Sequence, residues 1–296
     1  MNSEQIIQYI FSGVTVGSIY AVVAIGFNII YNATGIINFA QGEFVMLGGM
    51  ISITFSRFMP LFPAILFAVL ITALIGAVIE MTLIRGLKSP SVLRMVVITI
   101  GLSILIREAA LHVWDEKVRA LRFFTGSEIS SVEIFGAHVS PQVFWVLAIA
   151  ALIVAALFLF FKFTMTGQAM RACADNRSAA SLCGVNTRNV VTLSFALSAA
   201  IGALAGCVVS PLTQTHYAAG TELAIKGFTV AILGGLGDSM GAVAAGLLLG
   251  ILEAFSISVL PMAYKDVIAI TILLLILFFR PSGLFGNRAV ISLREF

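Results

Sequence analysis

Six ionisable side chains lie inside or at the ends of apolar stretches of this chain. They are Glu43, Glu80, Arg107, Glu108, Lys226 and Glu253. A charged group in lipid costs about 2.5 to 3.5 kcal/mol on insertion scales, so such groups are retained where they pair or line a water-filled path. Glu80, Arg107 and Glu108 stand near the ends of apolar stretches and are interpreted as interface or structural pairs. Glu43 and Lys226 lie beside glycine-interrupted segments, which favours a role in lining a pathway.

Residue sets for catalysis or metal binding are missing from the sequence. The histidines, His112, His138 and His216, have no partner at metal-ligand spacing, and no nucleophile stands with a base. Neither GxxxxGK followed by Ser or Thr nor GxGxxG occurs, so the chain has no phosphate-binding loop of its own. We predict that the chain is not an enzyme and needs no metal or cofactor. Any energy from ATP must come from a partner protein.

The composition is that of an integral membrane protein. Hydrophobic residues make up 60% of the chain and charged residues 10%, and the mean hydropathy is +1.08, whereas a soluble domain carries about 25% charged residues. The net charge of +3 does not indicate nucleic-acid binding, because the cations lie in short loops between apolar stretches, where they set orientation in the bilayer. The three cysteines form no CxxC pair and are interpreted as packing residues.

The apolar stretches predict an all-α, polytopic transmembrane helix bundle, with residues 1–296 forming one transmembrane domain. A helix rises 1.5 Å per residue, so about 20 apolar residues cross the hydrocarbon layer. We expect about nine crossings, or eight if a short arm from Phe228 is re-entrant. Outside the glycine-interrupted segments, the predicted spans are Ile6 to Ile30, Leu61 to Leu83, Val92 to Val113, Gln142 to Phe161, Val190 to Val209, Ala242 to Leu260 and a last span from Val267 to Phe279.

Two glycine-interrupted segments stand out between these spans. The first, Gly35 to Met50, contains Asn38, Gln41 and Glu43 and cannot face lipid cheaply, so it should line a cavity or form a broken helix. The second contains Gly234, Gly235 and Gly237, which either shape the cytoplasmic end of a path or simply allow close helix contact. Together the segments predict a pathway lined by Asn38, Gln41, Glu43, Lys226, Gly234, Gly235 and Gly237. Each segment follows a span rich in small residues, a pattern that indicates an inverted repeat.

A polar, basic interval lies near the middle of the chain, within the loop 162–192. Its four cations oppose only Asp175, and cationic loops stay in the cytoplasm. The small residues between Ala169 and Gly184 predict a short helix with a thin profile that could enter a groove on a partner, on which Arg171 and Asp175 could pair. The alternative is a solvated connector. The interval Trp114 to Pro141 has no cationic excess and is predicted to be external.

Four motifs resemble the membrane permease subunits of bacterial ABC importers for branched-chain amino acids, a family with relatives that import urea or short amides. They are GVTVGSIYAVVAIGFNIIYNATGIINFAQGEF, GQAMRACADNRSAASLCGVN, AILGGLGDSMGAVAAGLLLGILEA and RPSGLFG, and the resemblance runs nearly from end to end. It implies a multi-pass protein of the bacterial inner membrane that works with a second, related permease, two cytoplasmic ATP-binding subunits and an extracytoplasmic substrate-binding protein. Transport would proceed by alternating access.

The resemblance also implies that the central loop is the segment that couples to the ATPase. Because the loop departs from the EAA form of other ABC importers, their docking geometry does not carry over. The coupling positions are Gly167, Ala169, Arg171, Ala172, Ala174, Asp175, Asn176, Ala179, Gly184 and Asn186. Two alternatives stay open on the sequence: a permease for urea or short amides, and a secondary transporter driven by ions through Glu43 or Glu253.

Overall fold

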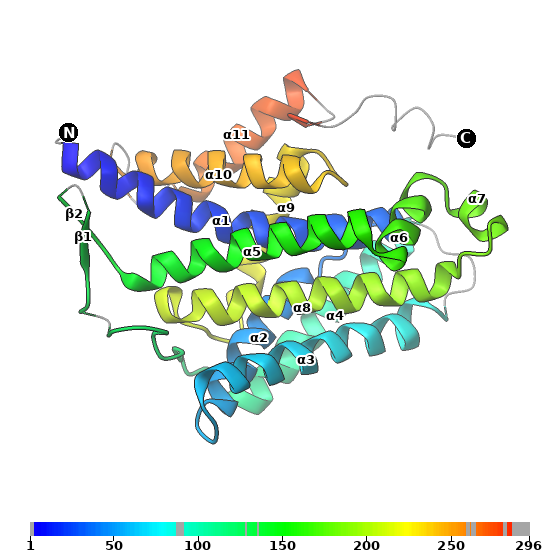
Figure 1. The fold of residues 1–296 in the computed structure, drawn as a ribbon, viewed down its shortest axis with the longest axis horizontal. Helices are drawn as coiled ribbons and strands as arrows, with labels where there is room; N and C mark the ends of the chain where they lie inside the picture. The colour runs from blue at the N-terminus through cyan, green and yellow to red at the C-terminus, as the bar shows by residue number, and fades with distance from the viewer. Residues whose placement is uncertain are drawn as a thin grey trace.

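The computed structural model is a bundle of helices that run roughly side by side (Figure 1). The structure describes residues 3–86, 92–127, 129–134, 136–258, 261, 265–280 and 283–285. Within this part of the chain, six helical segments are long and apolar enough to cross a membrane. They are α1 (Ser3–Thr34), α3 (Leu61–Ile79) with the π-helical turn η1 (Glu80–Ile84), α4 (Val92–Trp114), α5 (Pro141–Phe163), α8 (Thr187–Thr213) and α10 (Ser239–Ser256). The prediction of a polytopic helical bundle is confirmed.

Three further helices are too short to be complete spans. They are α2 (Gln41–Phe55), α9 (Ala219–Gly234) and α11 (Lys265–Phe279), with 15, 16 and 15 residues. Their lengths of roughly 22 to 24 Å fall below the hydrocarbon thickness. The structure therefore has six full-length candidate spans among the described residues, where the sequence suggested eight or nine crossings of all lengths. The helix α9 also begins earlier than expected, since Ala219 to Glu222 were assigned to an external loop.

The two ends of the bundle carry different structures. At one end lies a small antiparallel hairpin, β1 (Val132–Ile134) paired with β2 (Ala137–Val139), within the interval predicted to be external. At the other end lie the short helices α6 (Met165–Asp175) and α7 (Arg177–Leu182) (Figure 1). The hairpin was not expected from the sequence. The opposite placement of the two regions agrees with an external loop at one end and a cytoplasmic segment at the other.

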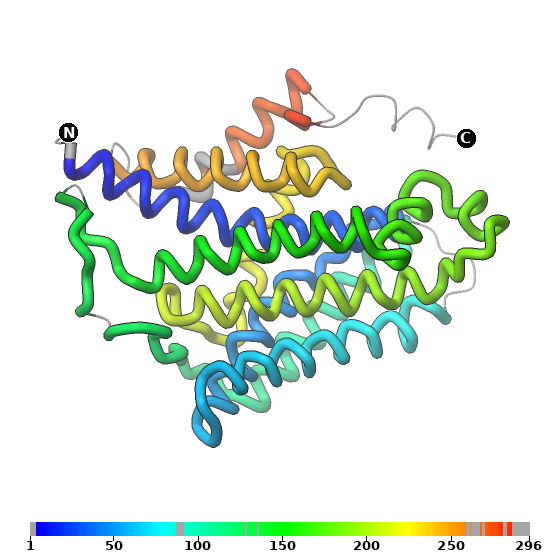
Figure 2. Tube along the Cα trace, viewed as in Figure 1, coloured from blue at the N-terminus to red at the C-terminus, as the bar shows by residue number. Residues whose placement is uncertain are grey.

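Helix neighbours follow the same pattern in the two halves of the chain. The first long helix, α1, packs on α9 and α10, and α8 packs in the same way on α2 and α3, while α1 contacts α8 and α2 contacts α9. The tube view shows α1 and α8 running in opposite directions (Figure 2). This is the relation expected of two inverted copies.

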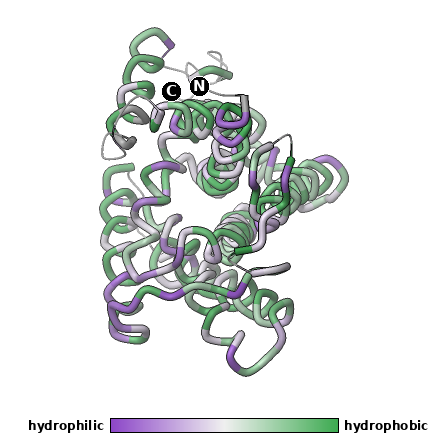
Figure 3. Tube along the Cα trace, turned by 90° about the vertical axis from the view of Figure 1, so that its left-hand side faces the viewer, coloured by the Kyte–Doolittle hydropathy of each residue, from purple (hydrophilic) through white to green (hydrophobic). Residues whose placement is uncertain are grey.

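Burial separates a central layer from an outer layer. The most apolar windows of α1 and α8 are 72% and 67% buried, whereas those of α4 and α5 are each 22% buried. Leu66, Leu70 and Leu74 lie along α3 at helical spacing and are exposed. Hydrophobic residues cover most of the helices seen from the end of the bundle (Figure 3). The outer helices thus present apolar faces suited to lipid or to another apolar subunit, and the buried polar groups lie on the sides of the helices that face the bundle interior.

Candidate transport pathway and coupling segment

Small residues bring α1 and α10 into close contact. A Cβ atom placed on Gly17 would lie 2.6 Å from the carbonyl oxygen of Gly246, and one on Gly13 would lie 2.7 Å from the Cα of Ile251. Only residues without a side chain allow the two backbones to approach this closely. The seam fixes the position of α10, and therefore of Glu253, against α1.

The first buried polar centre joins α1, α9 and α10. Lys226 Nζ lies 2.5 Å from Glu253 Oε1, and the hydroxyl of Tyr20 donates a hydrogen bond to Glu253 Oε2 at 3.0 Å. Lys226 Nζ also stands 6.0 Å from the centre of the Tyr20 ring. Glu253 is 1% exposed, and each of its two carboxylate oxygens has a hydrogen-bond partner, so this network is complete without water. Such a pair stabilises the packing of three helices only as long as both partners are present.

The second buried polar centre lies where α2 meets α4 and α9. The hydroxyl of Ser103 donates to Glu43 Oε1 at 2.8 Å, and the hydroxyl of Thr221 donates to the same oxygen at 3.4 Å. Arg107 Nη1 donates to Thr221 Oγ1 at 3.2 Å. The other carboxylate oxygen, Glu43 Oε2, is buried and has no hydrogen-bond partner. This centre is therefore incomplete, in contrast to the centre around Glu253.

The start of α2 also contacts the neighbouring long helices. Ser198 Oγ donates to Gln41 Oε1 at 2.6 Å, and Gln41 Nε2 donates to the carbonyl of Ser198 at 3.3 Å. The side chain of Asn38 accepts a hydrogen bond from the backbone of Ala40 at 3.1 Å, while its buried Nδ2 atom has no partner. Asn38 and Ala40, just before Gln41, are thus buried inside protein, as the sequence predicted for a segment unable to face lipid, whereas Gly35 is exposed.

Two asparagines of α1 hold the glycine turn between α9 and α10. Asn28 donates to the carbonyl of Asp238 at 2.9 Å and accepts from the backbone of Gly237 at 3.0 Å, and Asn32 donates to the carbonyl of Gly237 at 2.8 Å. Gly235 and Gly237 have φ angles of 104° and 92°, a region that favours glycine. Their role in this chain is conformational: the turn lets α10 begin at Ser239, with Asp238 accepting a hydrogen bond from the backbone of Met240.

The central segment forms two short helices rather than one. The break falls at Asn176, whose side chain accepts a hydrogen bond from the backbone of Ala179 at 2.9 Å and so caps α7. Thr164 caps α6 by accepting from the backbone of Gly167 at 3.0 Å. Burial raises the pKa of the Cys173 thiol, and the charge of Arg177 acts in the opposite direction. A buried thiol with a raised pKa is a packing group, which agrees with the sequence interpretation for Cys173; the same interpretation is wrong for Cys183, whose side chain is exposed.

The predicted coupling positions divide between the surface and the interior. Gly167 is buried, and Ala169 and Ala174 are half-buried. The other positions are exposed: Arg171, Ala172, Asp175, Asn176, Ala179, Gly184 and Asn186. Among the described residues, Arg171 and Asp175 form no ion pair with each other, so their predicted pairing is not seen. Met165 and Leu182, which the sequence argument did not name, are 84% and 90% exposed and add apolar surface to the segment.

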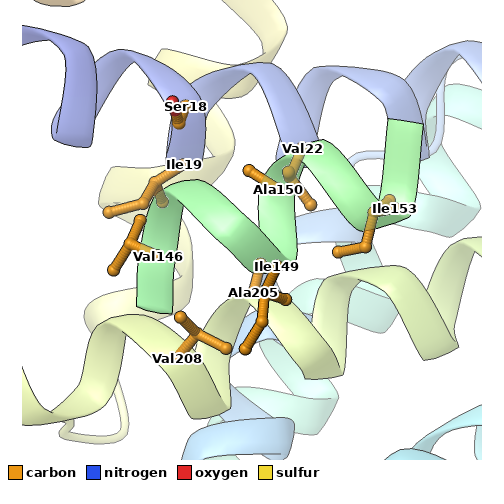
Figure 4. A pocket seen from close by; sticks show the side chains of 9 residues that line it. All are labelled: Ser18, Ile19, Val22, Val146, Ile149, Ala150, Ile153, Ala205 and Val208. Atoms are coloured by element: carbon orange, nitrogen blue, oxygen red, sulfur yellow. The ribbon is translucent and has the colours of Figure 1, made fainter. Parts of the chain in front are cut away.

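A small apolar crevice lies between α1, α5 and α8, lined by Val22, Val146, Ile149, Ala205 and neighbouring residues (Figure 4). Its free volume of about 10 Å³ is roughly the space for one water molecule. Ser18 supplies the hydroxyl on its lining, and its Oγ donates to the carbonyl of Val14 at 2.7 Å. The crevice is therefore too small and too apolar to hold a polar solute.

The structure joins residues that the sequence argument left apart. Arg107 was interpreted as a structural residue near a span end, yet it belongs to the network around Glu43. Glu80 fits the structural interpretation, since it is buried and accepts a 2.5 Å hydrogen bond from Thr192, while Glu108 is exposed. Ser103, Thr221 and Tyr20 were missed, because a hydroxyl within an apolar stretch gives no signal by itself.

An inner layer with buried polar centres, an outer apolar layer and a short polar segment at one end define a polytopic membrane permease. Residues 9–277 match the family described as the permease component of the branched-chain amino acid transport system. The chain belongs to this family, and it is a transport subunit rather than an enzyme.

Curated relatives cover nearly the whole chain. The high-affinity branched-chain amino acid transport system permease protein BraD of Pseudomonas aeruginosa is 34% identical over 96% of this chain and 97% of its own length. The protein LivH of Salmonella typhimurium, with the same description, is 33% identical over 97% of this chain and 99% of its own length. A probable branched-chain amino acid transport permease protein LivH of Methanocaldococcus jannaschii is 24% identical over 91% of this chain.

Proposed function

We propose that this chain is a permease subunit of a bacterial inner-membrane ABC importer for branched-chain amino acids. Its relatives of 33–34% identity are described as permeases for that transport. The whole chain would act as one transmembrane unit beside a second, related permease. Two cytoplasmic ATP-binding subunits and an extracytoplasmic binding protein would complete the importer. Permeases for urea or short amides are not favoured, because these relatives carry no such description.

The observation that carries the proposal is the pairing of a buried polar interior with an exposed segment at one end. The segment α6–α7 exposes Arg171, Leu182 and Met165 outside the long helices, as a docking surface requires. In the proposed mechanism, ATP binding in the partner changes the spacing of the ATP-binding subunits and moves this segment. The inverted halves then rock against each other, which opens the path first to one side and then to the other.

An ion-coupled secondary transporter is the alternative from another class. The network around Glu253 argues against it, because Lys226 already neutralises that carboxylate. Uptake of radiolabelled leucine into proteoliposomes containing the full complex decides between the two mechanisms. We expect uptake to require ATP and the binding protein and to continue after an ionophore collapses the ion gradients. Uptake that persists without ATP but stops with the ionophore would overturn the proposal.

The coupling role is tested by Arg171→Glu. Because Arg171 is exposed on α6, reversing its charge should leave the permease folded and weaken co-purification of the ATP-binding subunits by several-fold, with a matching loss of uptake. Arg57→Glu serves as the matched control, since Arg57 is an exposed arginine that follows α2 and lies outside the segment. Equal co-purification of both variants with wild-type yield would count against a coupling role for α6.

A further inference from the structure

The starting observation is a buried carboxylate that is only half satisfied. Glu43 is 1% exposed; one oxygen accepts hydrogen bonds from Ser103 and Thr221, and the other has no partner. Buried polar atoms in native proteins are nearly always hydrogen-bonded, and leaving an acceptor empty costs free energy. The position of Glu43 Oε2 therefore calls for a donor from outside the chain. An ammonium group is the donor that matches a carboxylate best.

A positive group stands on the other side of the same network. Arg107 donates to Thr221, which donates to Glu43, and the guanidinium attracts the carboxylate electrostatically. Arg107 is half-buried on α4, one turn after Ser103, so both side chains reach the junction from one face of that helix. A guanidinium binds carboxylates through paired N–H groups. The junction thus holds a carboxylate, Glu43, and a guanidinium, Arg107, which are linked through the hydroxyl of Thr221.

The helix ends at the junction support the same charge arrangement. Both α2 and α9 begin here, and Glu43 and Thr221 lie in their first turns. Helix N-termini favour negative charge, so they stabilise Glu43 as a carboxylate and would also favour the carboxylate of a solute. Half-helices whose N-termini meet inside a membrane protein are a recurring way to hold a charged solute.

We propose that the junction of α2, α4 and α9 is a binding site for the head group of a zwitterionic α-amino acid during its passage. Glu43 Oε2 accepts the solute's ammonium group, and Arg107 binds its carboxylate. The inference rests on the proposed function, because it takes an α-amino acid as the cargo. It adds a polar recognition step inside the permease to the selection made by the binding protein.

Access to the site requires the two short helices to separate. A Cβ atom on Gly220 would lie 2.7 Å from both Glu43 Oε2 and the carbonyl oxygen of Gly42, so α2 and α9 touch through their glycines. The structure therefore has the site closed, with Glu43 Oε2 facing Gly220. Rocking of the two halves would part this contact and admit the solute.

Competition binding on the assembled complex tests the inference. The permease, its partner permease and the ATP-binding subunits are purified in nanodiscs without the binding protein, which has an amino acid site of its own. Binding of tritiated leucine is competed with 4-methylpentanoate, which lacks the amino group, and with 3-methylbutylamine, which lacks the carboxylate. We expect Glu43→Gln to weaken leucine binding about tenfold or more and to leave inhibition by 4-methylpentanoate nearly unchanged.

The opposite selectivity is expected of Arg107→Gln. This variant should weaken the binding of leucine and of 4-methylpentanoate about tenfold and leave the binding of 3-methylbutylamine nearly unchanged. Glu80→Gln is the matched control, since Glu80 is also buried and accepts a hydrogen bond from a threonine but lies in another part of the molecule. It should bind all three compounds as the wild type does. If Glu43→Gln fails to assemble, Glu43→Asp replaces it, since it keeps the charge while shifting the carboxylate. It should weaken the binding of leucine and leave inhibition by 4-methylpentanoate nearly unchanged.

The outcomes separate the inference from the proposed function. The inference is overturned if the wild-type complex shows no saturable leucine binding, if Glu43→Gln binds leucine normally, or if it weakens all three compounds equally, as expected when Glu43 Oε2 holds only a structural water. ATP-driven uptake of leucine by the wild type is measured in parallel. Intact uptake with any of these results rejects the site alone, whereas absent uptake rejects the proposed function.

Discussion

The two buried acids of the bundle differ in how completely they are paired. Glu253 and Glu43 are each 1% exposed, and each lies on a helix that packs against α9. Glu253 has Lys226 on one oxygen and Tyr20 on the other, while Glu43 has two hydroxyls on one oxygen and no partner on the other. A closed network serves packing, and an open one retains the capacity to bind. Burial alone therefore does not mark a functional acid; an unmet hydrogen bond does.

The largest effect is expected from breaking the closed centre. Glu253→Gln removes the negative partner of a buried lysine, and loss of one member of such a pair costs about 3 to 5 kcal/mol in unfolding free energy. Thermal and SDS-induced unfolding of the purified permease measure the loss. The double variant Lys226→Met with Glu253→Gln removes both charges and should recover more than half of it. If Glu253→Gln alone were as stable as the wild type, the ion pair with Lys226 would contribute nothing to the unfolding free energy.

The next effect concerns the glycine contact beside the open centre. Gly220→Ala places a methyl group against the Gly42 backbone and Glu43 Oε2, and such overpacking costs about 1 to 3 kcal/mol. We also expect leucine uptake to fall, because the short helices can no longer close. Gly101→Ala is the matched control on α4, since nothing lies within 4 Å of its added carbon, and it should be neutral or stabilising by up to about 1 kcal/mol. Equal stability of both variants would contradict the close contact.

A smaller effect is expected when the closed centre keeps its ion pair but loses its hydroxyl. Tyr20→Phe removes a hydrogen bond to a charged acceptor, worth about 1.5 kcal/mol at the lower end of the range for such bonds. The ring that faces Lys226 is retained. Stability should fall by that amount in the same unfolding assays, while leucine uptake per assembled complex stays at the wild-type level. A selective loss of uptake with unchanged stability would assign this centre to the transport path.

The smallest effect on stability is expected at the open centre. Glu43→Gln keeps an acceptor for Ser103 and replaces a carboxylate that is only half satisfied, so the unfolding free energy should change by no more than about 1 kcal/mol. Unfolding of this variant and of Glu253→Gln is compared under one condition. A loss at Glu43 as large as that at Glu253 would remove the distinction between a packing acid and a binding acid.

The sequence by itself determined the membrane class, most of the long helices, the segment unable to face lipid and the exposed central segment. Hydrophobicity, helix length and loop charge are local quantities, so they can be read from a run of residues. The motifs also indicated the family that the comparisons then established. The start of α9 could not be predicted from the sequence, because its first residues resemble a polar loop.

Only the tertiary structure decided which polar groups meet. Ser103 and Thr221 reach Glu43 from 60 and 178 residues away, and Tyr20 reaches Glu253 from 233 residues away. The sequence placed Arg107 at a span end, whereas the structure brings it to Thr221 of α9, next to Glu43 of α2. A hydroxyl or an arginine takes its role from the partner that helix packing brings within hydrogen-bonding distance, and that partner is set by the fold rather than by neighbouring sequence.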